Sequence, residues 1–504
     1  MGKKVLLVGS YSIIEPLGLM VLSQVAREEG WDPSIELIKE QDFGYLERIV
    51  SHLNPQIIGA SVYTGNHVQL FNWLDQIKKE RPELKTVVGG PHPTLNPKES
   101  KHHADYVVVS EGIEPFRKIL RGESKESIIF SESKNNLPLA DRKNFYNTSR
   151  VHRDSPIKSI ITSVGCPHNC GHCYNSVRVS HLKNQLGKND FQALSKFLGG
   201  DNSRLFPKSI RSVKDICLEV EDILNISPET KLIFDQSDIH GKNLNWLKEF
   251  AKEFPKLGVK YHALLRFEYA DPNKPKSKER IDLMKQAGCT GLTFAIESGI
   301  PCIRDEVLKR KMDEELMFRT FSHLKELDFK VRTQQMLGLP YGATSQETPI
   351  NLDADLKTLE LNVRLRQETG LPAIAWASIY TPYLGTETGN YCRKHGFYSG
   401  NNDDIHPTFF TRSVLRFPKK WIGPNLSAKN QKDWLSEEEQ ETYRDKLQML
   451  RDIFTDCSRH EDGHIFAKNL VENEISNKSN ASKYAFQSTQ LRNHLYNHEL
   501  YCVR

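Results

Sequence analysis

The sequence predicts an α/β protein: a doubly wound parallel sheet, then a partial (β/α)6 barrel, then a mostly helical C-terminal region. The main observation is that short β-rich runs alternate with helical periodicity over residues 1–122 and again over 156–392. Strands that alternate with helices pair in parallel. The second observation is the length, because 504 residues, 38% of them hydrophobic, suffice for about two to four domains.

The first region, residues 1–122, is expected to be Rossmann-like. Strands are predicted at 4–9, 34–39, 57–63, 86–91 and 105–110, and helices at 15–30, 43–53, 68–82 and 114–122. Ligands of such sheets bind at the carboxyl ends of the strands. After the fourth strand, Gly89 and Gly90 either let a ligand approach the backbone closely or form only a turn.

The next regions are a linker and the barrel. Residues 123–155 are polar and are expected to be an irregular linker. Residues 177–210 delay the first barrel helix, so they are expected to form an insertion near the barrel mouth, a candidate lid. The barrel strands are predicted at 158–164, 231–237, 261–267, 291–298, 330–340 and 373–382.

The last region, residues 393–504, is mostly helical and polar. Ser436 followed by glutamates predicts a helix start. The polar run 473–483 is expected to be disordered. Specificity is expected in 177–210 and in 391–430, which includes Trp421, because loops at a barrel mouth usually carry it.

The composition excludes several classes of protein. The net charge of +5 is small and the charges are interleaved, which does not favour nucleic acid as an obligate partner. No apolar run approaches the roughly 18–20 residues that a membrane span needs. The N-terminus has no cleavage site typical of a signal peptide and is expected to be a buried strand. We therefore expect a cytoplasmic protein.

The most informative motif is "VGCPHNCGHCYNS", which starts at Val164 and places Cys166, Cys170 and Cys173 at the spacing C-x3-C-x2-C. In a cytoplasmic chain these thiols are expected to bind a metal rather than to form disulfides. Three thiolates can hold three irons of a [4Fe–4S] cluster and leave the fourth iron free for a small molecule. The alternative is zinc with His168 or His172 as a fourth ligand, which would be cramped within eight residues. The other six cysteines are scattered and are expected to be small buried hydrophobes.

The cysteine motif, followed by the aromatic Tyr174 and placed after the first barrel strand, resembles the radical S-adenosylmethionine superfamily. The resemblance runs from about Ser159 to Cys392. It implies a [4Fe–4S] cluster on the three cysteines, whose unique iron chelates S-adenosylmethionine. It also implies reductive cleavage of that cofactor to a 5′-deoxyadenosyl radical, with a flavodoxin- or ferredoxin-like electron donor.

Later segments resemble the same superfamily. "FAIESG" implies that Glu297 and Ser298 bind S-adenosylmethionine, and "LLRFE" implies that Arg266 contacts its methionine carboxylate. "QMLGLPYGAT" places adenine contacts near Leu337, although Tyr341 departs from the usual pattern. Each segment also has a simpler interpretation, a turn for the last and a surface ion pair for Arg266.

The second predicted barrel strand ends in "IFDQSDIH". Asp235 and Asp238 are expected to face the barrel mouth. Alternatively, Asp238 caps the following helix.

The N-terminal region is similar to the cobalamin-binding subgroup of the superfamily. "GGPHPTLNP" and "SEGIEPF" carry this similarity, which implies a corrinoid or nucleotide-tail pocket. The cobalt-ligating motif D-x-H-x-x-G is missing, so cobalamin would bind without a histidine from that motif. His67 and His92 are the histidines near the strand ends, and they are expected to be surface loop residues rather than ligands. The pocket residues implied are Ser61, Gly89, Gly90, Glu111 and Gly112.

The resemblance implies a cobalamin-dependent methyltransferase that acts on an unactivated carbon of a small molecule or peptide. Two alternatives stay open. One is a radical enzyme that catalyses rearrangement or ring chemistry without methyl transfer. The other is a zinc-stabilised corrinoid- or nucleotide-binding sensor. The predicted domains are 1–122 for cobalamin binding, 123–155 for the linker, 156–392 for the barrel and 393–504 for the helical region.

Overall fold

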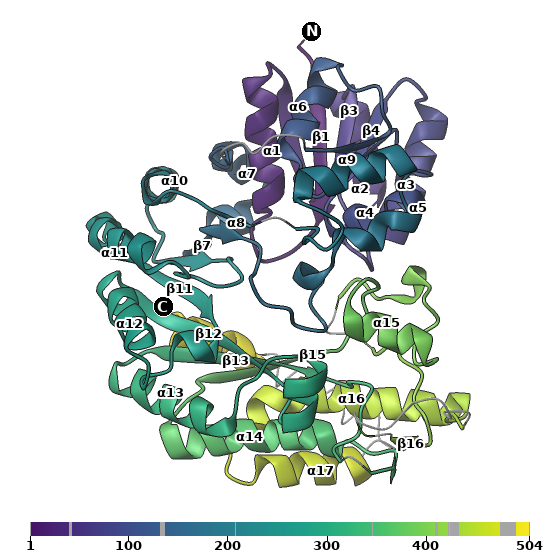
Figure 1. Cartoon of the computed structure of the whole chain (residues 1–504). Coiled ribbons are helices and arrows are strands. Elements are labelled where there is room, and N and C mark those ends of the chain that lie inside the picture. The colour runs from purple at the N-terminus through teal and green to yellow at the C-terminus, as the bar shows by residue number, and fades with distance from the viewer. Residues whose placement is uncertain are drawn as a thin grey trace. The chain divides into compact units, whose positions relative to one another are not determined.

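Two parallel six-stranded sheets organise the chain (Figure 1). The structure, a computed structural model, describes residues 2–39, 43–131, 137–206, 208–344, 346–408, 412–421, 423, 433–473 and 490–502. The chain divides into unit 1, which comprises Met1–Pro167 and Asn175–Thr230, and unit 2, which comprises His168–Tyr174 and Lys231–Arg504.

The sheet of unit 1 has the strand order β2-β1-β3-β4-β5-β6. Its central strands are near-continuous apolar runs because both faces are covered by helices. Val5, Leu6, Leu7 and Val8 of β1, for example, are all buried. The strands are β1 (Lys4–Ser10), β2 (Asp32–Ile38), β3 (Ile57–Ser61), β4 (Lys85–Gly89), β5 (Tyr106–Val109) and β6 (Ile128–Phe130).

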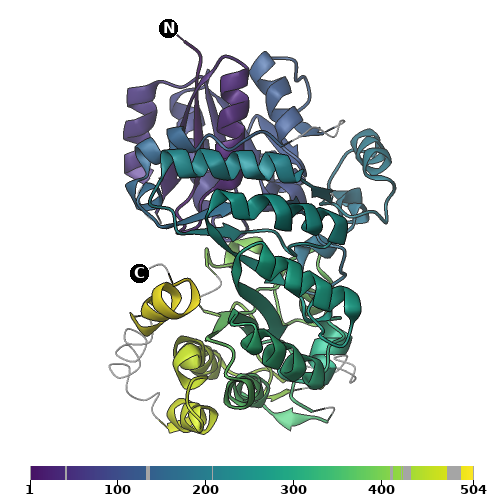
Figure 2. The ribbon, with the colours of Figure 1, turned by 90° about the vertical axis from the view of Figure 1, so that its left-hand side faces the viewer.

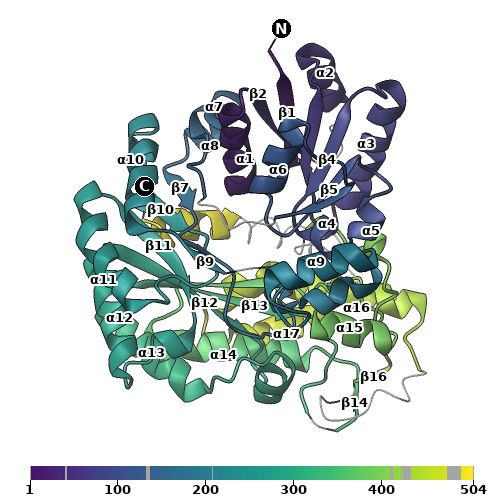
Figure 3. The same ribbon diagram turned by 45° about the horizontal axis from the view of Figure 1, so that its top comes forward.

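Helices cover both faces of this sheet, as Figure 3 shows. On one face, α1 (Leu17–Glu28) and α6 (Ile113–Arg121) pack on Val5 and Leu7. On the other, α2 (Phe43–Leu53) and α3 (His67–Glu80) pack on Leu6 and Val8. The short helices α4 (Pro91–Leu95) and α5 (Pro97–Ser100) follow β4. The predicted doubly wound α/β fold is confirmed.

The segment expected to be an irregular linker contains regular structure instead. It includes β6, the sixth strand of the sheet, and the helices α7 (Arg142–Thr148) and α8 (Arg150–Arg153). The fully buried Arg142 fixes this segment by pairing with Glu15 at 3.1 Å and with Glu219 at 2.7 Å. A buried arginine needs such partners, and its ion pairs hold in place a segment that the polar composition predicted to be irregular.

The insertion after the cysteine motif belongs to unit 1. Its expected role as a lid of the barrel mouth stays a prediction. Its apolar residues, among them Val177, Leu182 and Leu194, form a buried cluster with Leu95 and Val109 of unit 1. Its elements are η1 (Tyr174–Ser176), η2 (Val179–Asn184), α9 (Lys188–Leu198) and β9 (Ser209–Ile210), which pairs with β8 (Ser163–Val164); α10 (Val213–Ile226) follows.

The second sheet has the strand order β15-β13-β12-β11-β10-β7. These are the six predicted barrel strands, and they lie side by side in sequence order. Helices pack on its outer face, where Phe294 of β12 contacts Phe267 and Phe321. Figure 2 shows the teal and green helices of unit 2 side by side along the strands. The strands are β7 (Ile157–Ile160), β10 (Leu232–Asp235), β11 (Lys260–Leu265), β12 (Cys289–Glu297), β13 (Lys330–Leu337) and β15 (Ile374–Ile379). The helices and turns between them are α11 (Leu244–Glu253), η3 (Phe254–Leu257), η4 (Phe267–Tyr269), α12 (Pro275–Gln286), η5 (Ile303–Val307), α13 (Glu314–Glu326) and α14 (Asp353–Thr369).

The C-terminal region is helical, as predicted. Ser436 begins α16 (Glu437–Cys457) with a capping box to Glu439. Near the chain end, Tyr501 lies edge-on to Phe234 and His262 of the second sheet. The remaining elements are α15 (Glu387–Lys394), η6 (Asn402–Asp404), α17 (Gly463–Asn473), η8 (Tyr496–Leu500) and the strand pair β14 (Thr348–Pro349) with β16 (Lys420–Trp421).

The polar run predicted to be disordered lies, from 474 onward, outside the described residues. Among the helices in the described ranges, none combines the length and the apolar character of a membrane span.

Candidate functional site

A cavity of about 300 Å³ lies at the carboxyl edge of the sheet in unit 1. Its wall is mainly apolar and includes Leu19 of α1, Val108 of β5 and Phe116 of α6. Val164, two residues before Cys166, also lines it. The structure brings all five residues of the predicted corrinoid pocket to this wall: Ser61, Gly89, Gly90, Glu111 and Gly112.

Gly90 shows why glycine is needed at this edge. Its φ of 101° is one that side-chain-bearing residues rarely adopt, and a Cβ there would lie 3.0 Å from the carbonyl oxygen of Val62. At Gly89 a Cβ would meet Val108 at an ordinary 3.6 Å. Gly89 therefore keeps space open in the cavity, whereas Gly90 is required by the backbone itself.

Glu111 is a carboxylate in this mainly apolar wall. Burial raises its pKa, while hydrogen bonds from the Ile113 amide and the Ser131 hydroxyl act in the opposite direction. The carboxylate accepts from the amide of Ile113 at the start of α6, where unpaired helix N–H groups favour an acceptor. Its main contact is thus local, and the cavity offers a ligand mostly apolar surface.

The part of the cysteine motif that belongs to unit 2, His168–Tyr174, is held there by backbone hydrogen bonds. The Gly171 amide donates to the Leu308 carbonyl at 3.2 Å, and the Gly171 carbonyl accepts from the Thr388 amide at 3.0 Å. A Cβ on Gly171 would lie 2.4 Å from the carbonyl oxygen of Val307, so only glycine fits at this point. The loop between Cys170 and Cys173 therefore has a fixed path.

Two arginines surround the buried thiol of Cys170. Nη1 of Arg266 donates to its Sγ at 3.2 Å, and Nη1 of Arg310 lies 3.9 Å from the same atom. Arg266 also pairs with Glu268 and donates to the carbonyl of Arg310 at 3.1 Å. N–H donors near a ligating sulfur tune an iron–sulfur centre. Arg266, predicted to contact a methionine carboxylate, thus lies beside the cysteine loop.

Glu297 ends β12 in a strained conformation. Its φ is 68°, and the register of β12 shifts at this point. Residues held in this left-handed region cluster at functional sites. Its carboxylate lies 3.4 Å from Nε2 of His172, within the cysteine motif, and 3.5 Å from Nη1 of Arg310. The pKa of Glu297 is lowered: burial raises it, but the charges of His172, Arg310 and Arg266 outweigh burial.

Arg204 of the insertion contacts two backbone carbonyls of unit 1, one on each side of the run that contains Cys170 and Cys173. It donates through Nη1 to the Asn175 carbonyl at 2.6 Å and through Nη2 to the Pro167 carbonyl at 2.8 Å. These carbonyls flank the run that contains Cys170 and Cys173. The planar guanidinium suits two acceptors at once.

The remaining predicted site residues have different surroundings. Ser298 is buried and accepts from the Ile300 amide at 3.2 Å, so its hydroxyl shapes the turn after β12. Leu337 is buried in the core that includes α16, which gives no support to a cofactor contact by its side chain. Tyr174 is 39% exposed, and Cys166 and Cys173 are half-buried.

Asp235 lies at the end of β10, as predicted, but it is almost fully buried and pairs with Nδ1 of His240 at 2.6 Å. The next helix, α11, is capped by Asn243, so the interpretation of Asp238 as its cap is wrong.

Two further expectations need correction or addition. His67 and His92, expected on the surface, are both fully buried. Arg310 was not predicted, although the basic run Lys309–Lys311 soon after β12 was a signal for it. Asp355 of α14 was also missed. It accepts from the Gly338 amide at 2.8 Å, within the segment "GLP" of the predicted fifth strand motif.

The comparisons with known proteins agree with this geometry. Residues 3–120 match the family model described as the B12 binding domain. The structure of the radical S-adenosylmethionine methyltransferase TsrM from Kitasatospora setae matches over 94% of this chain and 99% of that chain, with a TM-score of 0.55 and 14% identity. The cobalamin-dependent S-adenosylmethionine radical enzyme OxsB matches over 98% of this chain and 76% of that chain, with a TM-score of 0.59 and 15% identity.

The chain has the fold of the cobalamin-dependent radical S-adenosylmethionine enzymes. The predicted resemblance is thereby confirmed for the fold. Among curated proteins, this radical S-adenosylmethionine-fold chain is similar to cytidylyl-2-hydroxyethylphosphonate methyltransferase from Streptomyces wedmorensis, 19% identical over 77% of this chain and 76% of that protein. A shorter match, 25% identical over 32% of this chain and 41% of the relative, is the uncharacterized methyltransferase PH0819 from Pyrococcus horikoshii.

Proposed function

We propose that this protein is a cobalamin-dependent radical S-adenosylmethionine methyltransferase that acts on an unactivated carbon of a small molecule. The observation that carries the proposal is the wall of the unit 1 cavity. It unites the five predicted pocket residues with Val164, which leads directly into Cys166. The cavity of the domain that matches B12-binding proteins is therefore lined in part by the residue that begins the cysteine motif.

The residues present fit these cofactors. Cys166, Cys170 and Cys173 would hold a [4Fe–4S] cluster, and the N–H groups of Arg266 near Cys170 would compensate the charge of its sulfur. The apolar cavity, with its two glycines, suits a flat aromatic group such as a nucleotide tail. When bound, the cluster with S-adenosylmethionine supplies radical chemistry, and cobalamin supplies the methyl group.

The charged residues of unit 2 have separate tasks in this proposal. Glu297 would accept hydrogen bonds from the amino group of S-adenosylmethionine, because its low pKa keeps it ionised. Arg310, held by Glu297 and the Ala295 carbonyl, would face the methionine carboxylate. His172 would link Glu297 to the cysteine loop and keep the two in register.

The proposal also includes a reducing setting and an electron donor. None of the nine cysteines, all of which lie within the described residues, is joined in a disulfide, and a cluster requires reduced thiolates. We infer a cytoplasmic enzyme that receives electrons from a flavodoxin- or ferredoxin-like protein.

The test is anaerobic reconstitution with iron, sulfide and hydroxocobalamin, followed by S-adenosylmethionine and a strong reductant. The two products to quantify by mass spectrometry are 5′-deoxyadenosine and S-adenosylhomocysteine. Both products, the second dependent on cobalamin, are expected. Deoxyadenosine alone would indicate radical chemistry without methyl transfer. Neither product, with zinc in place of iron, would favour the sensor interpretation and overturn the proposal.

A further inference from the structure

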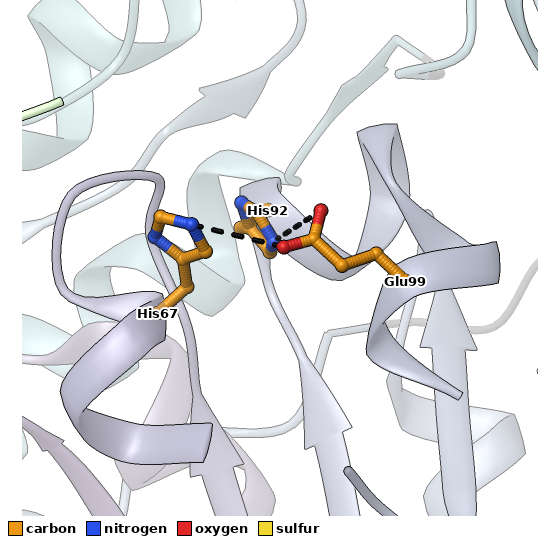
Figure 4. A group of neighbouring side chains, drawn as sticks. All are labelled: His67, His92 and Glu99. Carbon is orange, nitrogen blue, oxygen red and sulfur yellow. Dashed lines mark ion pairs between the residues drawn. The ribbon is translucent and has the colours of Figure 1, made fainter. Parts of the chain in front are cut away.

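We propose that His67, His92 and Glu99 form a binding site for a divalent transition-metal ion of the zinc class. The site lies after the strands β3 and β4 of unit 1, as Figure 4 shows. One ligand atom from each residue can be chosen so that all three lie within 4.8 Å of one another. Two imidazoles and one carboxylate, with a fourth position for water, are a common ligand set of zinc.

The distances and burial support a metal rather than a surface ion pair. Nε2 of His92 lies 3.5 Å from one oxygen of Glu99, and Nε2 of His67 lies 3.8 Å from the other. Tetrahedral zinc needs donor atoms about 3.3 Å apart, so small side-chain shifts close the site. Both histidines are fully buried, while the Glu99 side chain is 36% exposed. The carboxylate can therefore move, and an ion can enter from its side.

His92 directs a ring nitrogen that makes no hydrogen bond toward Glu99. Its Nδ1 lies 3.0 Å from the Thr64 hydroxyl, whereas its buried Nε2 has no hydrogen-bond partner. A ligating histidine usually donates its other ring N–H to an oxygen acceptor, and Thr64 provides one. A buried ring nitrogen without a hydrogen bond is costly, and a metal ion would satisfy it.

His67 must change its ring proton to join the site. The Gly65 amide donates to its Nδ1 at 3.1 Å, so the proton of the neutral ring lies on Nε2. On metal binding this proton leaves Nε2, and a proton from solvent takes Nδ1, so the ring stays neutral. The Gly65 amide then turns away, which its φ of 111° and missing side chain permit.

Such an ion would fasten the rim of the cavity. The Val62 amide donates to the Gly89 carbonyl at 2.8 Å, and the His92 amide donates to the Val62 carbonyl at 3.1 Å. The loops after β3 and β4 therefore already touch, and a metal between His67 and His92 would lock them. None of the three ligands lines the cavity in the described part of the chain. The metal would therefore fix the shape of the cavity without touching a molecule bound inside it.

The test is zinc binding by the full-length, cluster-loaded protein without a tag, read by elemental analysis and by zinc X-ray absorption. We expect about one zinc per chain and a first shell of nitrogen and oxygen at about 2.0–2.1 Å, without the sulfur at about 2.3 Å that zinc in the cysteine loop would show. Zinc should also raise the Tm. Glu99→Gln, at a partly exposed residue, should fold and lose most of the zinc, as should His92→Gln.

The matched control is His103→Gln, whose ring stacks on Phe71 beside the cluster but lies outside it. It should keep the zinc. Sulfur in the first shell, no zinc in the wild type, or unchanged zinc in folded Glu99→Gln would each overturn the proposal. None of these readouts uses catalytic activity, so the result is independent of the methyltransferase proposal.

Discussion

The carboxyl edge of the sheet in unit 1 is lined mainly by apolar and glycine residues, whereas the corresponding edge in unit 2 is crowded with charges around Cys170. The contrast is clearest in two carboxylates, the half-buried Glu111 and the buried Glu297. The pKa of Glu111, in the apolar edge, is raised by burial, while that of Glu297 is lowered because His172 and arginines outweigh burial. Burial alone therefore does not decide the charge of a site. The first edge is built to recognise shape, and the second to hold ionised groups.

Removing the thiol at the centre of the charged edge should have the largest effect. Cys170→Ser should abolish iron and sulfide retention and the formation of 5′-deoxyadenosine, because a hydroxyl is a poor cluster ligand. Iron, sulfide and product are measured together. Cys502→Ser, at an exposed cysteine, is the control and should behave as the wild type. A Cys170→Ser protein that keeps its cluster and activity would contradict the role given to this edge.

Neutralising Glu297 should have the next largest effect. Glu297→Gln leaves His172 and Arg310 without their counter-charge. Losing hydrogen bonds to charged groups costs about 1.5–3 kcal/mol, so cleavage of S-adenosylmethionine should fall about 10- to 100-fold. The rate of 5′-deoxyadenosine formation measures this. Glu315→Gln, at a largely exposed glutamate, is the control. Equal rates for the two variants would show that the charge of Glu297 is not used.

The pH dependence of Glu297 has a definite sign. Its pKa is lower in the folded than in the unfolded protein, so its contribution to stability is present above the unfolded value of about 4.5. The contribution is lost as the pH falls through the folded pKa. The difference in Tm between the wild type and Glu297→Gln should therefore shrink only below about pH 4.5.

The apolar edge can be tested by a substitution that changes the space in the cavity without changing any charge. Gly89→Ala adds a methyl group in ordinary contact with Val108, so the fold should tolerate it, but it removes space from the cavity. Overpacking costs about 1–3 kcal/mol, so cobalamin affinity should fall about 5- to 100-fold. Titration of cobalamin absorbance measures the Kd.

Gly90→Ala should instead lower the Tm, because alanine would be strained at the positive φ of residue 90. Unchanged affinity in Gly89→Ala would place the cofactor elsewhere.

The retention of iron by the cysteine loop should depend on the two hydrogen bonds that Arg204 donates to backbone carbonyls. Lysine offers one nitrogen in place of two, so Arg204→Lys cannot hold both the Pro167 and Asn175 carbonyls. We expect iron to be lost about two- to fivefold faster during gel filtration, which corresponds to about 0.5–1 kcal/mol. Arg178→Lys, at the residue bridged to Arg204, is the control. Equal iron loss in the two variants would show that the contact does not support the loop.

The sequence predicted the strands well because parallel strands buried on both faces are continuous apolar runs. It missed β6, since Ile128–Phe130 is only three residues long at a sheet edge. The sequence also did not predict that the insertion packs in unit 1. Its apolar residues pair with Leu95 and Val109, which are distant in sequence and carry no matching pattern.

Candidate site residues could be predicted from the sequence where they lie together in a short motif. The spacing of the cysteines singled them out, and the resemblance singled out Glu297 and the five residues that line the cavity. Arg310 and Asp355 were not, because their roles depend on contacts with Glu297 and Gly338 that only the fold creates. His67 and His92 were wrongly expected on the surface, since a loop position does not reveal what packs over it.

The last predicted effect concerns the buried Asp355 of α14, whose carboxylate accepts a hydrogen bond from the Gly338 amide. Burial raises its pKa to about 7, against a smaller opposing effect of the Gly338 amide. A raised pKa means that its stabilising contribution is lost as the pH rises through about 7. Asp355→Asn stays neutral and keeps an oxygen for the Gly338 amide. Its Tm should therefore exceed that of the wild type more at pH 8 than at pH 6, by the equivalent of about 1 kcal/mol. The exposed Asp282→Asn is the control variant. A pH-independent effect of Asp355→Asn would mean that the carboxylate is ionised across this range, and that this part of unit 2 tolerates a buried charge without a cationic partner.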